Sequence, residues 1–437
     1  MRFANLSDFQ AHLDALGLFH MDLTLDRVRF FLKAWGGPRP PFVLAHVLGT
    51  NGKGSTSAFL AALAEAHGLR TGLFTSPHFL DPRERVRLDG GLISEAAWLA
   101  AANAVWDLAS QAGLTYFEYL TGLALVAFAS NRVDLAIMEA GLGGRFDAVS
   151  ALTTDLTLYT PIGLDHEKIL GPTVQAIARD KAGAMRPGGQ ALSADQDPEA
   201  LAALTAVALA RGTRLSLARD LWTWEGQDLV PAPDLGLPRL TGVRLGLAGG
   251  HQRENARLAL AGWTFLAREQ GWPVRDEACL QGLARAFVPG RMQHVPGRPS
   301  LILDGAHNAQ ALTALKAALD QAAIKPQAVV FACLKDKTLD PMIPLVLSLT
   351  EGPVLVPGLP LPERAWPAGD LARLLGPRAR PAADVHEALA SLASLEDLEG
   401  PVLVCGSLYL LAEFYTRRTD LLHPGAEAYG PRKDLNP

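Results

Sequence analysis

Short apolar runs alternate with longer alanine- and leucine-rich segments along the first half of the chain. Four runs of strand length cover residues 42–48, 69–75, 133–138 and 155–160. The mostly apolar runs at residues 42–48 and 133–138 are typical of strands buried on both faces of a sheet. Helices are expected up to about residue 67 and over residues 95–111 and 117–130. Strands that alternate with helices predict a mostly parallel sheet covered on both sides.

The same alternation returns after residue 300 and predicts a second, smaller domain. Its expected strands cover residues 301–303, 328–333, 354–356 and 401–405, with helices from about residue 308 and up to residue 415. Proline and glycine are frequent over residues 288–299, which favours a linker there. We therefore predict an α/β fold with a large N-terminal domain (1–290), a hinge (291–299) and a Rossmann-like C-terminal domain (300–437).

Charge and composition narrow the classes of function. The 437 residues include 40 Lys and Arg against 45 Asp and Glu, a net charge of −5, so the chain lacks the basic field of a nucleic-acid binder. The three cysteines are far apart without metal-ligand spacing, as expected in a reducing compartment. The N-terminus lacks the apolar core of a signal peptide, and one of the longer uncharged runs, residues 119–131, is too short to span a bilayer. We expect a cytoplasmic protein with no nucleic-acid or membrane partner.

A glycine-rich turn between the first expected strand and helix carries the clearest chemistry. Its sequence is Gly49-Thr50-Asn51-Gly52-Lys53-Gly54-Ser55. Three glycines let the backbone turn tightly and direct N–H groups at an anion, and the helix N-terminus adds positive potential. Lys53 can reach the β- and γ-phosphates of a nucleotide, and Ser55 can bind Mg²⁺. The alternative is a plain glycine turn with an exposed lysine, but the position between a strand and a helix favours nucleotide binding.

Glu139 ends the apolar run at residues 133–138. Ligands of open α/β sheets gather at the carboxyl ends of the strands. Alone, Glu139 could equally be a capping or surface carboxylate; beside the glycine-rich turn it indicates a magnesium ligand.

Further segments extend this pattern along the chain. They are Ser76-Pro77-His78, Glu84-Arg85-Val86, Thr115-Tyr116-Phe117-Glu118, Glu139-Ala140-Gly141-Leu142-Gly143-Gly144-Arg145-Phe146-Asp147-Ala148, Asp165-His166, Lys181-Ala182-Gly183, Pro289-Gly290-Arg291, Asp304-Gly305-Ala306-His307-Asn308 and Cys405-Gly406-Ser407. Together with the glycine-rich turn, and in this order, they resemble the folylpolyglutamate synthase and dihydrofolate synthase family of the Mur ligase superfamily. The resemblance covers about residues 20–415.

The resemblance implies a bifunctional ATP-dependent ligase. A pterin-linked carboxylate would take the γ-phosphoryl group of ATP, and the amine of L-glutamate would displace phosphate from the acyl phosphate. Dihydropteroate and folyl glutamates would be the acceptors of glutamate. The resemblance also implies that a P-loop central domain binds ATP and pterin and that a C-terminal domain binds glutamate. The active site would lie in the cleft between these domains, and the protein would be a monomer.

By the same resemblance, most of the candidate residues serve the nucleotide and the metal. ATP would be bound by Gly49, Thr50, Asn51, Gly52, Lys53, Gly54, Ser55, Asn255, Arg291 and Asp304. Mg²⁺ would be bound by Ser76, Glu139 and His166, with Ser55 and a Lys181 carbamylated by CO₂ as further ligands. The expected catalytic set is Lys53, Glu139, His166, Lys181 and His307.

The remaining candidates would bind the two other substrates. The pterin substrate would contact Asp22, Leu23, Thr24, Thr115, Tyr116, Phe117, Glu118, Phe146, Asp147 and Ala148, and L-glutamate would lie near His307 and Ser407. Members of the family commonly have glycine where Thr24 stands.

Several of these assignments have a structural alternative. His166 could be a structural histidine, Lys181 could be a solvated helix residue and Arg291 could be a linker charge. His307 could cap a helix, and the aromatic candidates could belong to the core.

Three other functions also compete with the ligase. A UDP-muramyl peptide ligase shares the phosphate loop, but no separate N-terminal domain for the UDP group is evident before residue 42. A phosphate-loop kinase or nucleotide switch, or a non-catalytic nucleotide-binding module, would give the second domain no role.

Overall fold

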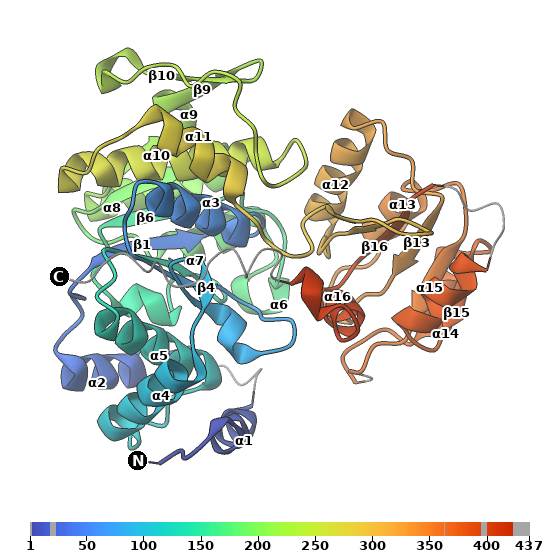
Figure 1. The fold of residues 1–437 in the computed structure, drawn as a ribbon, viewed down its shortest axis with the longest axis horizontal. Helices are drawn as coiled ribbons and strands as arrows, with labels where there is room; N and C mark the ends of the chain where they lie inside the picture. The colour runs from blue at the N-terminus through green and yellow to red at the C-terminus, as the bar shows by residue number, and fades with distance from the viewer. Residues whose placement is uncertain (1, 18–22, 362, 395–399, 423–437) are drawn as a thin grey trace. The chain divides into compact units, whose positions relative to one another are not determined.

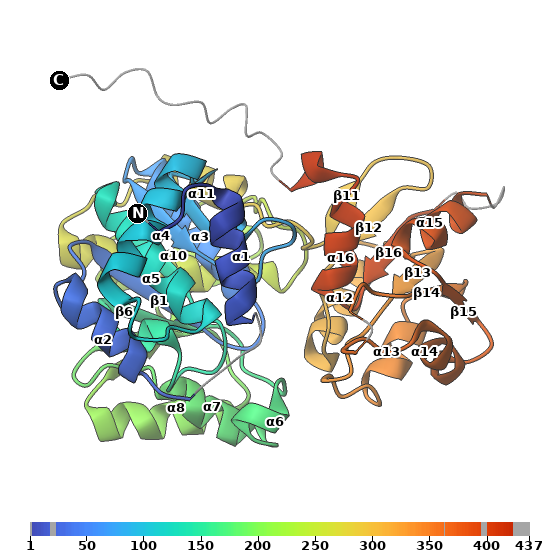
Figure 2. The ribbon, with the colours of Figure 1, turned by 90° about the horizontal axis from the view of Figure 1, so that it is seen from below.

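The chain divides into two compact units in a computed structural model that describes residues 2–17, 23–361, 363–394 and 400–422. The N-terminal unit comprises Met1–Gly163, Leu170–Gly246 and Glu254–Ala286. The C-terminal unit comprises Leu164–Ile169, Leu247–Arg253 and Phe287–Pro437. Each unit contains its own sheet and helices (Figures 1 and 2).

The N-terminal unit is built on an eight-stranded sheet with the strand order β4-β3-β2-β5-β1-β6-β7-β8. The strands are β1 (Val43–Leu48), β2 (Thr71–Phe74), β3 (Val86–Leu88), β4 (Gly91–Leu92), β5 (Leu135–Glu139), β6 (Leu156–Tyr159), β7 (Gln190–Ser193) and β8 (Arg214–Leu217). All neighbours are parallel except β3 against β2 and β4 against β3. Because β1 lies between β5 and β6, the loops that follow these three strands emerge at one edge of the sheet.

Helices cover both faces of this sheet. They are α1 (Leu6–Leu16), α2 (Asp26–Trp35), α3 (Lys53–Ala66), α4 (Glu95–Ala109), α5 (Tyr116–Ser130), α7 (Val174–Ala182), α8 (Pro198–Arg211), α9 (Ala218–Leu221), α10 (Gln252–Gln270) and α11 (Asp276–Arg285), with 3₁₀ turns η1 (Pro82–Arg85), η2 (Ala148–Ala151) and η3 (Pro233–Leu235). Helices α4 and α5 lie on one side of β1, and α3, α10 and α11 lie on the other (Figure 1). Helix α5 is buried nearly all round, which is consistent with its mostly apolar sequence. A Cβ on Gly282 of α11 would lie 2.7 Å from the Leu63 Cα of α3, so glycine permits this close helix packing.

The C-terminal unit has a six-stranded sheet with the order β11-β12-β16-β13-β14-β15. Its strands are β11 (Gln293–Val295), β12 (Leu301–Leu303), β13 (Ala328–Phe331), β14 (Val354–Pro357), β15 (Ala379–Ala382) and β16 (Val402–Cys405). Only β11, paired with β12, is antiparallel. Its helices are α12 (Ala309–Gln321), α13 (Met342–Leu347), α14 (Ala368–Leu375), α15 (Val385–Ala393) and α16 (Leu408–Tyr415), with η4 (Thr419–Leu421). Helices α12, α13 and α14 cover one face of the sheet and α15 and α16 the other (Figure 2).

The predicted α/β fold with mostly parallel sheets is confirmed. The unit boundary differs in detail from the predicted domains, because residues 164–169 and 247–253 group with the C-terminal unit. The segment predicted to be a hinge contains β11, which pairs with β12. The turn-rich segment before α10 forms the hairpin of β9 (Trp222–Glu225) and β10 (Asp228–Pro231). Within the described parts of the chain, no helix is long and apolar enough to cross a membrane.

Candidate functional site

The glycine-rich turn forms a compact loop between β1 and α3. The backbone N–H groups of Thr50 and Asn51 donate to the carbonyl of Pro161 after β6, at 3.0 and 3.2 Å. The Thr50 hydroxyl bonds with the backbone of Gly163 at 3.1 Å. Lys53 opens α3, and its Nζ donates to the Thr50 carbonyl at 3.1 Å. Neighbouring strand ends therefore hold the predicted phosphate loop in place, with the N-terminus of α3 facing out of it.

Two positions in this loop require glycine. Gly49 has φ +144°, and a Cβ there would lie 1.9 Å from the hydroxyl of Thr160. Gly52 has φ +90°, and a Cβ there would lie 2.3 Å from Oδ1 of Asn255. The same Asn255 oxygen accepts a bond from the Thr56 hydroxyl of α3 at 3.4 Å. Asn255, at the start of α10, thus packs against the left-handed turn of the loop, and the structure brings these predicted ATP ligands together.

Glu139 lies beside the phosphate loop because β5 pairs with β1, with Val47 opposite Glu139. Its Oε2 accepts the backbone N–H of Ser76 at 3.1 Å, and Ser76 follows β2 on the other side of β5. An ideal Cβ on Gly54 would lie 3.6 Å from the same oxygen. Glu139 is only 4% exposed. The structure therefore places the Glu139 carboxylate against both Ser76 and the first turn of α3.

The loop after Glu139 packs on the end of α7. The Gly144 N–H donates to Asp180 Oδ2 at 2.9 Å, and the Arg145 N–H donates to the Asp180 carbonyl at 3.0 Å. A Cβ on Gly144 would lie 2.6 Å from the Lys181 Cα, so this approach requires glycine. Lys181 is 4% exposed, which contradicts the alternative of a solvated helix lysine.

Two of the predicted pterin residues form the N-terminal cap of α5. Glu118 accepts the Thr115 N–H at 2.8 Å, and Arg27 donates to both oxygens of Glu118 at 2.9 and 3.1 Å. The Glu118 carboxylate thus has a structural role, and its contact with the substrate stays a prediction. Tyr116 is buried, with the Arg85 guanidinium carbon 5.5 Å from its ring centre.

The other predicted pterin residues differ in exposure. Phe117 packs against Gly141, where a Cβ would lie 2.7 Å from its ring. Phe146 is 36% exposed, under the guanidinium of Arg145, and Ala148 is buried. Asp147 is buried and accepts the N–H groups of Gly141 and Val149 at 2.9 and 3.0 Å. Near the N-terminus, Leu23 is 56% exposed and the Thr24 hydroxyl accepts the Asp26 N–H. Asp22 lies outside the described residues.

In the C-terminal unit, Asp304 organises the turn after β12. Its two carboxylate oxygens accept the N–H groups of Met292 and Ala306, both at 2.8 Å. The Gly305 N–H donates to the carbonyl of Gly290, and a Cβ on Gly305 would lie 2.2 Å from Nη1 of Arg291. Arg291 therefore lies against the turn that begins with Asp304, and the structure brings these two predicted ATP ligands together.

A cluster of charged and polar side chains surrounds Asp165. Lys337 Nζ donates to its Oδ1 at 2.5 Å, Asn308 Nδ2 donates to its Oδ2 at 3.1 Å, and His307 Nε2 lies 3.6 Å from Oδ2. The backbone N–H of His166 also donates to Oδ1, at 2.8 Å. Burial acts to raise the pKa of Asp165, but the His307 contact and the Lys337 charge hold that pKa well below its usual range.

His307 and Ser407 lie at one edge of this sheet because β12 and β16 are parallel neighbours. The Gly406 N–H donates to the carbonyl of Ala306 at 2.8 Å. Ser407 caps α16 through its hydroxyl, whereas Asn308, not His307, caps α12. The alternative that His307 is a helix cap is therefore wrong.

Sequence reasoning missed two groups of residues. Lys337 and the carboxylate of Asp165 were not assigned a role, although Lys337 stands in a charged segment just after an expected strand. The second group is on the loop after Ser76, where Arg85 Nε donates to His78 Nδ1 at 2.9 Å. Burial and the Arg85 charge lower the pKa of His78 to about 3, so this imidazole is neutral at physiological pH.

The carboxylate oxygens of Glu139 are of the type that a divalent cation binds in proteins. Magnesium is usually held by one or two carboxylates together with substrate phosphates, and Glu139 lies beside the predicted phosphate loop. Among the residues that the structure describes, no group of three or more His, Cys, Asp or Glu side chains could hold a metal ion.

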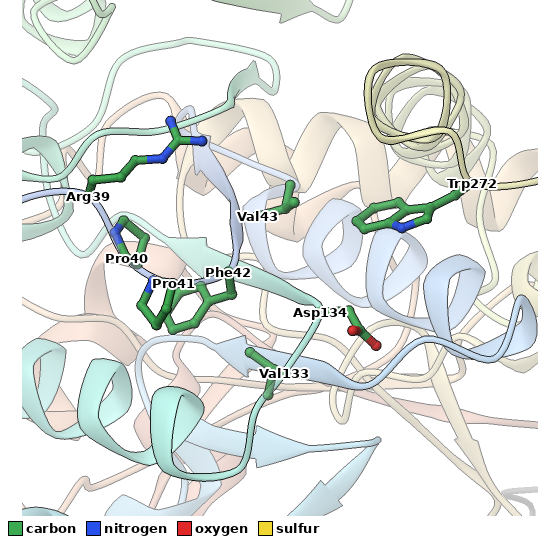
Figure 3. A pocket seen from close by; sticks show the side chains of 8 residues that line it. All are labelled: Arg39, Pro40, Pro41, Phe42, Val43, Val133, Asp134 and Trp272. Atoms are coloured by element: carbon green, nitrogen blue, oxygen red, sulfur yellow. The ribbon is translucent and has the colours of Figure 1, made fainter.

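A separate pocket lies at the opposite edge of the N-terminal sheet. It has a volume of about 410 Å³ and is lined by Arg39, Pro40, Pro41, Phe42, Val43, Val133, Asp134 and Trp272 (Figure 3). These residues include the segments that lead into β1 and β5, whereas the phosphate loop leaves the other end of β1. None of the predicted site residues lines this pocket.

The chain is similar to known proteins over most of its length. Residues 290–408 match the family model described as the glutamate ligase domain of Mur ligases. Folylpolyglutamate synthase of Lacticaseibacillus casei is 32% identical over 410 residues, which cover 88% of this chain and 92% of that protein. Escherichia coli FolC, solved in complex with DHPP and ADP, has a TM-score of 0.85 at 29% identity and covers 96% of this chain and 99% of its own. A bifunctional folylpolyglutamate synthase/dihydrofolate synthase from Yersinia pestis, solved with AMPPNP and Mn ion, has a TM-score of 0.84 at 32% identity, with 96% of this chain and 99% of that chain covered.

Proposed function

Because this chain belongs to the folylpolyglutamate synthase and dihydrofolate synthase family of ATP-dependent ligases, we propose that it joins L-glutamate to dihydropteroate and to folyl glutamates. The observation that carries the proposal is the position of the Glu139 carboxylate, against Ser76 and the first turn of α3. A negatively charged side chain beside a phosphate-binding loop fits a cation that is shared with the nucleotide. The match of residues 290–408 to a glutamate ligase domain supports glutamate as the second substrate.

The reaction must bring two anions together. The pterin-linked carboxylate attacks the γ-phosphorus of ATP, the bond to the β-γ bridging oxygen breaks, and ADP leaves. The neutral amine of glutamate then attacks the acyl carbon, phosphate leaves with its electron pair, and the amine proton is lost. Lys53 and the N–H groups of the phosphate loop would neutralise charge on the transferred phosphoryl group.

We propose Ser76, Glu139 and His166 as the protein ligands of the divalent cation. A bound Mg²⁺ would neutralise the phosphate oxygens. We also propose that Lys181 is carbamylated, since its burial disfavours a charged ammonium and only the neutral amine reacts with CO₂. Additional density on the Lys181 side chain in a crystal structure would support carbamylation, and an unmodified amine next to a bound metal would exclude it.

The C-terminal residues have complementary roles in the proposal. Arg291 and Asp304 would contact ATP, with Asp304 fixing the backbone of the turn and Arg291 supplying positive charge. His307 and Ser407 would orient the incoming glutamate so that its amine is aligned with the acyl carbon. The predicted pterin contacts, the monomeric state and the cytoplasmic location stay predictions.

ADP release with L-glutamate and Mg²⁺ tests the proposal. We expect release with dihydropteroate and with tetrahydrofolate, and none when glutamate is omitted. Release with tetrahydrofolate alone would make the protein a polyglutamate synthase only. Release with a UDP-muramyl dipeptide, or release that does not depend on glutamate, would contradict the proposed substrates.

A further inference from the structure

Six residues, Leu164–Ile169, group with the C-terminal unit although the residues before and after them belong to the N-terminal unit. Apolar burial does not explain this grouping. Leu164 and Ile169, the large apolar side chains at the two ends of the segment, are 46% and 42% exposed. The short helix α6 (Glu167–Leu170) contains no buried residue. The contacts that fix the segment are therefore polar.

Asp165 is the centre of these polar contacts. Lys337 Nζ and Asn308 Nδ2 donate to its two oxygens, at 2.5 and 3.1 Å. The Thr338 hydroxyl adds a bond to Glu167 Oε1 at 2.8 Å. The side chains of Lys337 and Asp165 are each only 8% exposed. Ion pairs this buried are sensitive to the loss of one partner, because the other charge is left without compensation.

The same carboxylate also faces two histidines. His307 Nδ1 lies 2.7 Å from the carbonyl of Gly305, which can only accept, so Nδ1 carries a hydrogen. Its Nε2 is 3.6 Å from Asp165 Oδ2. The backbone of His166 is bonded to Asp165 Oδ1 at 2.8 Å. The orientation of both histidines thus depends on where Asp165 is held.

We propose that Lys337 is a positioning residue: by binding Asp165, it fixes residues 164–169 on the carboxyl edge of the C-terminal sheet and thereby orients His166 and His307. Lys337 touches neither histidine in the contacts described above and acts through Asp165. Its importance for catalysis rests on the proposed function, whereas its effect on residues 164–169 does not.

Hydrogen exchange of the protein without ligands tests the structural part. Lys337→Met retains most of the apolar stem and removes the charge, and we expect the amides of residues 164–169 to exchange at least tenfold faster than in the wild type. Lys337→Arg should restore slow exchange. Lys335→Met is the matched control, since Lys335 Nζ donates to the carbonyl of Glu363 rather than to Asp165, and it should leave the segment unchanged. Where Lys337→Met fails to fold, Asp165→Asn carries the same test, because it removes the charge that binds Lys337 and replaces one acceptor oxygen by an amide donor.

Kinetics test the functional part separately. We expect kcat for glutamate ligation to fall at least tenfold in Lys337→Met, with recovery in Lys337→Arg and no change in Lys335→Met. Unchanged exchange of residues 164–169 in Lys337→Met, or no rescue by Lys337→Arg, would overturn the proposal. A wild type without ligase activity would refute the proposed function and leave the exchange result to stand alone.

Discussion

A matched pair of glycines on either side of α3 gives a quantitative test of the phosphate loop. Gly52 precedes the helix with φ +90°, and Gly68 follows it with φ +91°. An alanine at either position has nearly the same backbone strain, about 1–2 kcal/mol for a left-handed conformation. A Cβ at Gly68 would meet nothing within 4 Å, whereas a Cβ at Gly52 would lie 2.3 Å from Oδ1 of Asn255. Gly52→Ala therefore carries an additional cost that Gly68→Ala lacks.

The size of this additional cost follows from the contacts of Asn255. Its side chain must move to admit the new methyl group, which breaks the 3.4 Å bond from the Thr56 hydroxyl. Losing one such bond costs about 1 kcal/mol. We expect unfolding free energies lower by about 1–2 kcal/mol in Gly68→Ala and about 2–3 kcal/mol in Gly52→Ala.

Nucleotide affinity separates the two variants further. Loss of one charge-assisted bond from a loop N–H to a phosphate costs about 1.5–3 kcal/mol, which weakens binding about tenfold or more. Calorimetric titration with Mg·ADP should show this loss in Gly52→Ala and wild-type affinity in Gly68→Ala. Equal affinities for the two variants would refute the placement of this loop around the nucleotide.

Three further perturbations test other parts of the account. Lys53→Met should lower kcat/KM for ATP about a hundredfold through loss of a positive charge on the phosphoryl group, with little change in the melting temperature; wild-type kinetics would exclude a role for this lysine. Glu139→Gln should raise the Mg²⁺ concentration at half-maximal activity about tenfold or more, since a neutral amide is a weaker ligand than a carboxylate, and an unchanged metal titration would exclude Glu139 as a ligand. Burial and the Arg85 charge lower the pKa of His78 in the folded protein to about 3. As the pH falls below about 6.5, the unfolded chain therefore takes up a proton on His78 that the folded protein does not, and the unfolding free energy falls. Between pH 7 and pH 5 the unfolding free energy of the wild type, measured by urea unfolding, should fall by about 2 kcal/mol more than that of His78→Gln. Parallel pH profiles of the two unfolding free energies would contradict the buried neutral imidazole.

The sequence predicts the central strands of the sheets well because several of them are short, mostly apolar runs. The run at residues 42–48 becomes β1, and the run at residues 133–138 becomes β5 with Glu139 as its last residue. The pattern fails at the short antiparallel strands β3 and β4, which have only three and two residues. Segments this short are too brief to show a period.

The candidate site was predictable where a motif and a strand end coincide. The phosphate loop, Glu139 and Asp304 each follow an expected strand, and the structure places each at a carboxyl edge. Asp165 and Lys337 are 172 residues apart in sequence, and nothing local to either residue indicates their pairing. Such contacts depend on tertiary packing, which a periodicity analysis cannot reach.

The origin of the phosphate oxygen tests the central claim most directly. Dihydropteroate labelled with ¹⁸O in its carboxylate would be incubated with ATP, Mg²⁺ and L-glutamate, and the released phosphate analysed by mass spectrometry. An acyl phosphate predicts one ¹⁸O atom in each phosphate released, together with dihydrofolate as the product. Unlabelled phosphate, or label transfer without an amide product, would contradict a ligase that activates the pterin carboxylate.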